Sequence, residues 1–557
     1  MQISSRILVF LLVLVAAVFF LPFLGRVHLF DWDEINFAEC SREMISTGDY
    51  TRVYINFQPF WEKPPLFFWM QSTAMKWFGI NEFSARFPNA VCGIATLVII
   101  FLCGKKLYGK EFGLTWALAY LGSIFPNMYF KSGIIDPWFN LFIFLSFYFF
   151  ILYYWRRNDP AKEDLRYSPA FYAICSGVCM GLAMLTKGQV ALMIFIAALG
   201  VYFLLNRFRV QVGWKHVIFF LLAAGLVTFT WYGYETIKNG PWFINEFLRY
   251  QYRLFTTHDA GQKGFFGYHY IVILFGCFPA SVFAISSFFR ANPVNTREKD
   301  FRKWMLILFW VVTILFSIVQ SRIIHYSSLA WFPVTFLAAY SFYKWEKNER
   351  PYRRYTTLIT GILGGLLALI LIALPFVAMN LEKLIPYVSD PFARANMAAD
   401  VSWSGWDSLP GFVLAIVLLA GIRRLRQKDF RAAKWIFFGG TAVVTFLSAT
   451  LIVPKVERYS QGAAIDFFKE RAGEDCYVHV LGYKSYAQLF YARKEKPLNP
   501  QAYNQEWLLQ GRVDKPVYFV TKVHKADQYL QRPGIKELYR KNGFVFLKRE
   551  IPPATLP

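Results

Sequence analysis

The sequence ILVFLLVLVAAVFFLPFL at residues 7–24 is followed closely by DWDEINFAECSREMISTGDYTRVYINFQPFWEKPP at residues 31–65. The first stretch carries no charge and is long enough to cross a bilayer as a helix, which needs about 20 mainly apolar residues. The second stretch contains Asp33, Glu34, Glu39, Glu43, Glu62 and Lys63. Charged side chains beside a membrane helix either stay in water or converge on something charged, because hydrocarbon excludes them. We expect the second arrangement, with the rest of the chain as its scaffold.

The whole chain has the composition of a polytopic membrane protein. Of its 557 residues, 56% are hydrophobic, and this exceeds the roughly 45–50% apolar content of soluble domains. The net charge of +24 would suit a nucleic-acid-binding protein. However, the Lys and Arg residues form short clusters between apolar runs, as the positive-inside rule predicts for membrane proteins. We therefore expect membrane lipids, and no nucleic acid, as partners.

The apolar runs predict about thirteen membrane-spanning helices. Their ranges are 7–24, 86–104, 112–130, 137–155, 170–186, 190–206, 217–237, 269–289, 304–320, 327–343, 356–379, 409–422 and 435–453. Basic connectors follow the even-numbered runs and are therefore expected in the cytoplasm. The long connectors 25–85, 238–268 and 380–408 then face the periplasm. No Asn-x-Ser/Thr sequon occurs, which favours a bacterial inner membrane over the secretory pathway.

Two parts outside the spans have predicted structure of their own. Segments 36–46 and 66–78 have the pattern of amphipathic helices that lie along a membrane surface. After residue 453 the composition becomes polar, and the patterns predict helices and strands in alternation. The helices are 460–471 and 486–491, and the strands are 476–482, 516–521 and 544–549. The predicted fold is mainly α, with a transmembrane domain (1–453) and a small periplasmic α/β domain (454–557).

Three acidic residues are candidates for chemistry at the outer face. Asp33 and Glu34 stand together in the first periplasmic loop. Their alternative role is structural, as the acidic first turn of a helix, where they favour the helix dipole. Asp136, in KSGIIDPWF, stands at the outer start of a span and is expected near the same surface as Asp33. An acid before proline is also a common helix cap.

Basic residues stand at the same face. Lys63 is followed by Pro64 and Pro65, which restrict the backbone at this point of the chain. Lys187 ends a span and Arg322 lies in a short connector, where an unpaired charge is costly. A shared anionic ligand would satisfy these cations together, whereas ion pairs with the acids would serve structure alone. The sequence leaves both interpretations open.

His258 lies in the loop that follows the span 217–237. A single histidine in a loop is usually part of a polar surface. Together with Glu62 or Asp33 it could instead bind a divalent metal, although no metal-binding spacing motif accompanies it.

These pieces resemble the GT-C superfamily of polytopic glycosyltransferases that use polyprenyl-phosphate sugars, near the protein O-mannosyltransferase and lipid A aminoarabinose transferase branch. The resemblance rests on five stretches spread over the membrane part. They are DEINFAECSREMISTGDY (33–50), FWEKPPLFFW (60–69), SARFPNAVCG (84–93), GLAMLTKG (181–188) and the His258 loop.

The resemblance implies roles for the candidate residues. Asp33, with its neighbour Glu34, matches the acid that acts as base or orients the acceptor, and Asp136 matches the second acid. Lys63 would bind the lipid phosphate. Glu62 and His258 match the residues that hold a Zn²⁺, Mg²⁺ or Mn²⁺ ion in some members of the superfamily.

The sequence departs from the superfamily pattern at two places. Asn36 stands where aminoarabinose transferases carry an arginine. One phosphate contact is therefore either absent or supplied by Lys187 or Arg322. Gln262 replaces a histidine that many members repeat.

The chemistry fits this resemblance, because a sugar linked to phosphate already has a good leaving group. What remains is to activate a hydroxyl with a carboxylate and to neutralise the departing phosphate with cations. We therefore expect an inverting transferase that acts on lipid A, another glycan or a protein in the periplasm. The alternative function is a transporter or lipid-linked sugar flippase. Transporters place ionisable residues near mid-bilayer and often show repeated halves, whereas here the charges gather at one face.

Overall fold

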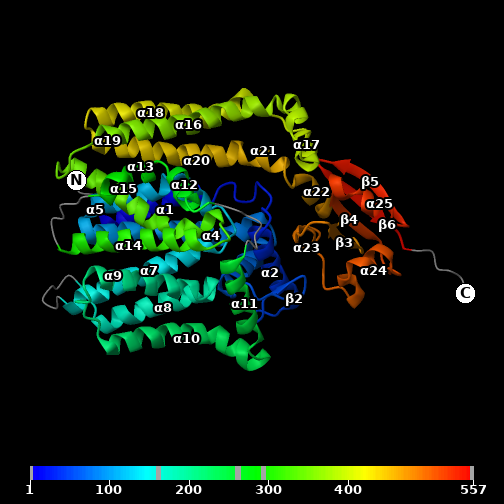
Figure 1. The fold of residues 1–557 in the computed structure, drawn as a ribbon, viewed down its shortest axis with the longest axis horizontal. Helices are drawn as coiled ribbons and strands as arrows, with labels where there is room; N and C mark the ends of the chain where they lie inside the picture. The colour runs from blue at the N-terminus through cyan, green and yellow to red at the C-terminus, as the bar shows by residue number, and fades with distance from the viewer. Residues whose placement is uncertain (1–3, 159–164, 258–264, 290–295, 552–557) are drawn as a thin grey trace, which may run out of the picture.

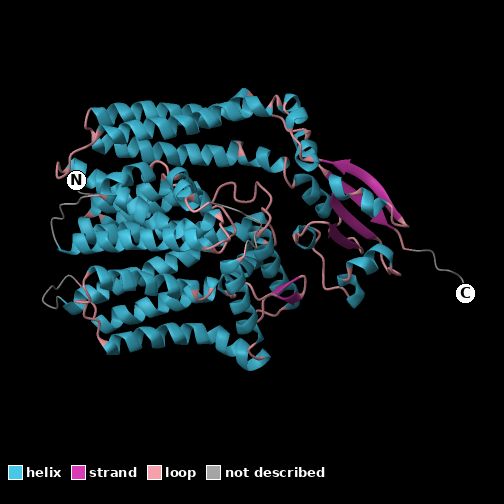
Figure 2. Cartoon of the chain, viewed as in Figure 1, coloured by secondary structure: helices cyan, strands magenta, loops and turns pink. Residues whose placement is uncertain are grey.

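The computed structural model describes residues 4–158, 165–257, 265–289 and 296–551. A bundle of long helices runs side by side along the molecule, and a small sheet with short helices lies beyond one end (Figures 1 and 2). The amino-terminal end of the first helix lies at the opposite end of the bundle. The described chain is thus mainly α, with the β structure confined to one end.

The bundle is built from apolar helices and helix pairs. In chain order they are α1 (Ser5–Phe20), α4 (Glu82–Tyr108), α5 (Lys110–Leu121), α6 (Ile124–Tyr129), α7 (Asp136–Asn158), α8 (Pro169–Lys187), α9 (Val190–Leu205), α10 (Trp214–Asn239), α12 (Tyr268–Gly276), α13 (Ala280–Phe288), α14 (Thr296–Ile318), α15 (Trp331–Glu346), α16 (Arg354–Ala378), α18 (Leu409–Arg426), α19 (Phe430–Lys434), η5 (Trp435–Gly439) and α20 (Gly440–Leu451).

Each predicted span coincides with one of these helices or with a broken pair. Within the described residues, eight helices are long and apolar enough to cross a membrane, and α12 with α13, bent by 118°, would make a ninth. The apolar helices α1 and α9 are shorter, and the predicted span 112–130 is divided between α5 and α6. The chain is therefore a multi-pass membrane protein, and the number of thirteen spans stays a prediction.

Short elements form the end of the bundle where the sheet lies, which we call the outer end. They are α2 (Asp33–Thr47), β1 (Tyr54–Ile55), β2 (Gln58–Pro59), α3 (Leu66–Phe78), α11 (Trp242–Thr256), η1 (Ile324–Ala330), η2 (Leu381–Lys383), η3 (Ile385–Tyr387), α17 (Pro391–Met397) and η4 (Gly405–Ser408). Helix α2 begins with Asp33 and Glu34 in its first turn, which suits its dipole. It ends at Gly48, whose φ of 72° only glycine adopts freely. Both predicted loop helices are thus present as α2 and α3.

The carboxy-terminal part folds around one four-stranded sheet in the order β3-β4-β6-β5. Its elements are α21 (Val453–Arg458), α22 (Gly462–Glu470), β3 (Tyr477–Leu481), α23 (Ala487–Tyr491), η6 (Pro500–Tyr503), α24 (Gln505–Gln510), β4 (Val517–Lys522), η7 (Val523–Lys525), α25 (Asp527–Leu530), β5 (Ile535–Lys541) and β6 (Phe544–Arg549). Strand β4 pairs in parallel with β3 and antiparallel with β6. The edge strand β5 was not predicted from the sequence. Six of its seven residues are exposed, so buried and exposed side chains do not alternate along it.

One hydrophobic cluster joins this small domain to the outer end of the bundle. Leu29, Ile35 and Ala38 from the first loop and α2 pack with Ile465, Phe467 and Phe546 from the small domain. Burial of apolar surface contributes about 25 cal/mol per Å², so this shared core holds the domain against α2. The small domain is therefore placed beside the acidic stretch, at the same end of the bundle.

Candidate functional site

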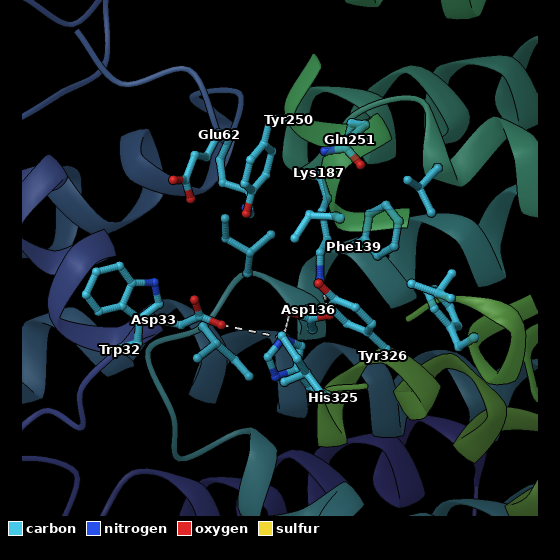
Figure 3. Close-up of a pocket in the computed structure, with 18 of the residues that line it drawn as sticks. Trp32, Asp33, Glu62, Asp136, Phe139, Lys187, Tyr250, Gln251, His325 and Tyr326 are labelled. Carbon is cyan, nitrogen blue, oxygen red and sulfur yellow. Dashed lines mark hydrogen bonds and ion pairs between the residues drawn. The ribbon is translucent and has the colours of Figure 1, made fainter. Parts of the chain in front are cut away.

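A cavity of about 1020 Å³ opens at the outer end of the bundle, beside the small domain. Its wall is formed by the start of α2, the 61–65 loop, the start of α7, the end of α8, helix α11 and η1. Figure 3 shows side chains that line it, among them the labelled Trp32, Asp33, Glu62, Asp136, Lys187, Tyr250, His325 and Tyr326. Lys63 lines the cavity as well. The structure thus brings together residues that are up to about 290 positions apart in sequence, as loop-and-helix-end sites often do.

Asp136 and Lys187 form an ion pair at the floor of this cavity. The Lys187 ammonium lies 2.6 Å from Oδ1 of Asp136, and the side chains are 16% and 5% exposed. Asp136 begins α7, and the loop before it is fixed because Asn89 donates hydrogen bonds to the carbonyls of Ser132 and Ile134. Lys187 ends α8, where Gly188 adopts a φ of 89°. The charge of Asp136 is therefore largely neutralised before any ligand binds.

Asp33 is the more accessible of the two acids. Its side chain is 31% exposed, and its Oδ2 lies 3.5 Å from Nε2 of His325. Among the described residues, His325 is the one basic side chain within ion-pair distance of Asp33. The Asp33 carboxylate is thus free to accept a proton from a molecule in the cavity, whereas the Asp136 carboxylate is engaged by Lys187.

Lys63 reaches the cavity from the loop that precedes α3. Its ammonium lies 3.4 Å from the hydroxyl of Tyr250 and 4.9 Å from the centre of that ring. The following Pro64 and Pro65 are buried, which fixes the direction of the Lys63 backbone. Described contacts give Lys63 no carboxylate within ion-pair distance. Its charge is available to an anion, as the resemblance implied.

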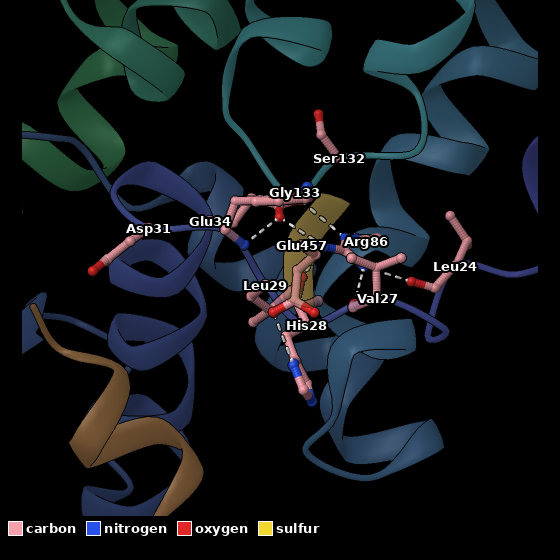
Figure 4. Close-up of polar contacts among 12 residues, drawn as sticks. Leu24, Val27, His28, Leu29, Asp31, Glu34, Arg86, Ser132, Gly133 and Glu457 are labelled. Carbon is pink, nitrogen blue, oxygen red and sulfur yellow. Dashed lines mark hydrogen bonds and ion pairs between the residues drawn. The ribbon is translucent and has the colours of Figure 1, made fainter. Parts of the chain in front are cut away.

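Glu34 lines the same cavity, but its carboxylate is bound by other groups of the protein (Figure 4). Arg86 donates to both of its oxygens, at 3.0 and 2.8 Å. The backbone amides of Phe30 and Gly133 donate to it as well, at 2.8 and 2.5 Å. Arg86 also donates to the carbonyls of Leu24, Val27 and His28. This network ties the first loop to α4 and to the loop before α7, and it supports a structural role for Glu34.

The remaining predicted site residues have different positions. Arg322 does not line the cavity, and its Nη2 donates to the Ser317 carbonyl at 3.2 Å. This placement offers no support for the phosphate contact assigned to Arg322. Glu62 lines the cavity, while His258 lies outside the described residues. Within the part of the chain that the structure describes, no three His, Cys, Asp or Glu side chains group as a metal site.

Several cavity residues were missed from the sequence. His325 and Tyr326 stand in the SRIIHYSS connector from which only Arg322 was chosen, and Tyr250 lies on the amphipathic helix α11. His325 could have been chosen, because a histidine in a short connector that is predicted to lie at the outer face is expected near Asp33. Tyr250 carries no such signal, because tyrosine is common on amphipathic helices.

The small domain contributes to the mouth of the cavity. Lys484 lines it, and its ammonium lies 4.8 Å from the ring centre of Trp32. Asp31 lies beside Ser485, and its surroundings raise the pKa of its carboxyl to about 6, since burial outweighs the Ser485 hydrogen bond. An acceptor that enters here would therefore meet both parts of the chain.

Comparisons with known proteins point to one class. The family model described as dolichyl-phosphate-mannose-protein mannosyltransferase matches residues 62–232. The chain is 25% identical over 348 residues to the undecaprenyl phosphate-alpha-4-amino-4-deoxy-L-arabinose arabinosyl transferase of Wigglesworthia glossinidia brevipalpis, covering 61% of this chain and 59% of that relative. The match thus spans less than two thirds of the relative's length. The protein of the same name from Aeromonas salmonicida is 25% identical over 406 residues, covering 71% of this chain and 70% of that one.

A solved structure has the same fold over nearly the whole chain. It is the crystal structure of ArnT from Cupriavidus metallidurans bound to undecaprenyl phosphate, with a TM-score of 0.75, 18% sequence identity and 98% of both chains covered. The chain therefore has the GT-C fold. The resemblance to the GT-C superfamily, predicted from the motifs, is confirmed.

Proposed function

We propose that this membrane protein is an inverting glycosyltransferase that moves one sugar from a polyprenyl-phosphate donor to a hydroxyl of an acceptor at the outer membrane face. The observation that carries this proposal is the cavity itself. It holds an accessible carboxylate (Asp33) and an available ammonium (Lys63) at the outer end of an apolar helix bundle. Sugar transfer from a lipid phosphate needs those two groups at that depth.

Both parts of the donor, the isoprenoid tail and the phosphate, have a matching part of the cavity. Apolar side chains from α9, from α14 and from Val319, which follows α14, form part of the wall. They are Val190, Met193, Ile194, Leu315, Phe316 and Val319. Lipid tails are as apolar as these side chains, so the isoprenoid chain can leave the bilayer and lie against this wall without exposure to water. The phosphate would lie at Lys63, whose charge stabilises the negative charge that develops as the sugar leaves.

The reaction then follows from the positions of the acids. The acceptor oxygen attacks the anomeric carbon while the bond from that carbon to the phosphate oxygen breaks. The bonding electrons leave with the phosphate, and the acceptor proton passes to Asp33 as general base. Attack opposite the leaving group inverts the anomeric centre. Asp136, paired with Lys187, is assigned to hold the donor sugar rather than to take the proton.

Purified protein in lipid vesicles tests this function. The first donor to supply is undecaprenyl phosphate 4-amino-4-deoxy-L-arabinose, because the names of the relatives point to it. Lipid A, a glycan and a protein serve as separate acceptors. Asp33→Asn should lower kcat by roughly 10²–10⁴-fold while donor binding persists, and Lys63→Gln should weaken donor binding. Normal transfer by Asp33→Asn would remove Asp33 from the mechanism.

Mass spectrometry of lipids that copurify identifies the donor independently. A bound polyprenyl phosphate or its sugar conjugate is expected. If the copurifying lipids contain no phosphorylated isoprenoid, and none stabilises the protein when added, the proposed donor class is wrong.

The site is proposed to face the periplasm of a bacterial inner membrane. Leu498 in the small domain is 94% exposed, so Leu498→Cys offers a label position. A membrane-impermeant maleimide should label it in spheroplasts without lysis. Labelling only after lysis would place the site on the cytoplasmic side.

The metal site implied by the resemblance also remains a proposal, with Glu62 and His258 as its ligands. Glu62 supplies one carboxylate to the cavity, and no step above passes through a metal. Elemental analysis of purified protein tests the site. A bound divalent metal that is lost in Glu62→Ala is the expected result, and metal-free active protein would contradict it.

A further inference from the structure

His325 lies between the two acids of the cavity (Figure 3). Its Nε2 is 3.5 Å from Oδ2 of Asp33 and 3.9 Å from Oδ2 of Asp136. The ring is 13% exposed and comes from η1, in the connector between α14 and α15. No other described residue stands within ion-pair distance of both carboxylates.

The contacts decide which ring nitrogen carries the proton. Burial lowers the pKa of His325, and Lys63 lowers it further although Asp33 opposes this. The ring is therefore neutral near pH 7 and holds one N–H. Because Nε2 faces two carboxylate oxygens, which only accept hydrogen bonds, the proton belongs on Nε2. Both distances exceed the usual 2.7–3.2 Å of a hydrogen bond, and catalytic contacts commonly tighten when substrate binds.

The backbone of His325 is tied to the helix that carries Asp136. The Ser328 hydroxyl donates to the His325 carbonyl at 2.5 Å, and Asn140 donates to that hydroxyl at 2.7 Å. Asn140 is four residues after Asp136 on α7, so both side chains lie on one face of the helix. The ring is thus held at a fixed place relative to Asp136, and Asp33 is the partner that can adjust.

We propose that His325 is a positioning residue, whose Nε2–H holds the Asp33 carboxylate turned toward the acceptor hydroxyl. This inference rests on the proposed function. An N–H that donates to one carboxylate oxygen fixes the direction of the carboxylate, and the other oxygen of Asp33 can then accept the proton of the acceptor. Lys187 already engages Asp136, which is why the histidine acts on Asp33. The charged or titratable groups around the ring are Asp33, Asp136, Lys187, Lys63, Tyr250 and Tyr326.

The test compares three substitutions in the full-length protein in lipid vesicles. His325→Leu removes the donor, and His325→Asn has an amide too short to reach Asp33. His325→Gln keeps an N–H near the position of Nε2. We expect the first two to lower kcat at least about tenfold, a part of the roughly 10²–10⁴-fold that a general base supplies. KM for the donor should change less than about twofold, because the Asp33 contact is not part of donor binding.

Rescue by His325→Gln separates positioning from a merely structural role. Because this variant keeps an N–H near the position of Nε2, it should restore most of kcat while KM for the donor stays unchanged. In an Asp33→Asn background, His325→Leu should cause no further loss, because coupled residues are not additive. His524→Leu, an exposed histidine of the small domain, is the matched control and should behave as wild type.

Two results would overturn the proposal. One is an unchanged kcat in His325→Leu or His325→Asn. The other is a His325→Gln variant that binds donor normally but is as slow as His325→Leu. If His325→Leu does not melt cooperatively, His325→Asn decides. A wild-type protein that binds the lipid phosphate yet transfers no sugar would instead contradict the proposed function.

Discussion

The Lys187 ammonium lies 2.6 Å from the Asp136 carboxylate, so the two acids of the cavity are not equivalent. Asp136 is neutralised by a neighbour on α8, whereas among the described residues the imidazole of His325 is the group within ion-pair distance of Asp33. The resemblance gave Asp33 the role of base and Asp136 the second acidic position, but the sequence offered no physical reason for that order. The ion pair ranks them, since the unpaired carboxylate is the one available as a base.

The Asp136–Lys187 pair should be worth more to stability than to proton transfer. Lys187→Met leaves a buried carboxylate without its partner, which typically costs about 3–5 kcal/mol. Asp136→Asn with Lys187→Met should recover part of that loss, because no buried charge is left alone. Thermal melting in detergent measures both. Equal melting temperatures for the single and double variants would show that the pair is not coupled.

The Glu34–Arg86 network is predicted to be structural. Both side chains are about 5% exposed or less, and Arg86 makes contacts to three carbonyls besides Glu34. Glu34→Gln should therefore lower the free energy of unfolding by roughly 1–3 kcal/mol, as for a weakened charged hydrogen bond. Protein that remains folded should keep the wild-type pH dependence of kcat. If Glu34→Gln changed the pH dependence of kcat but not the melting temperature, Glu34 would have a catalytic role.

Stability should depend on pH through Glu43. This residue is buried on α2, and burial together with the neighbouring Glu39 raises the pKa of its carboxyl from 4.5 to about 9. The folded protein therefore holds this proton more tightly than the unfolded chain. That contribution is complete below pH 4.5 and is lost as the pH rises through about 9.

Glu43→Gln tests this dependence, because a neutral amide cannot lose the proton. Between pH 6 and pH 9.5, the melting temperature of the variant should fall less than that of wild type. Glu382→Gln, at an exposed position, should melt like wild type at each pH. Parallel curves for Glu43→Gln and wild type would refute the assignment.

The shared core should control docking of the small domain. Ile35 is fully buried in the cluster that joins α2 to this domain. Ile35→Ala should cost about 2–5 kcal/mol and should speed limited proteolysis near residue 460. Val456→Ala, at a side chain that is 47% exposed, is the control. Unchanged proteolysis in Ile35→Ala would mean that other contacts hold the domain.

Local patterns were sufficient for most elements. The apolar runs coincide with the bundle helices, and α3 and β6 have the predicted bounds. These succeed because burial in hydrocarbon, or a face that packs on a core, imposes a pattern on neighbouring residues. Strand β5 was missed since its exposed side chains carry no such pattern.

The sequence by itself determined that this is a multi-pass membrane protein that resembles the GT-C glycosyltransferases, and it predicted that acids and cations gather at one face, because hydropathy and motifs are local properties. Only the tertiary structure decided their partners. In the structure Glu34 pairs with Arg86, Asp136 pairs with Lys187, and Asp33 lies beside His325. Arg322 does not line the cavity. Electrostatic energy depends on distance and burial, and both are fixed by how helices far apart in the chain pack together.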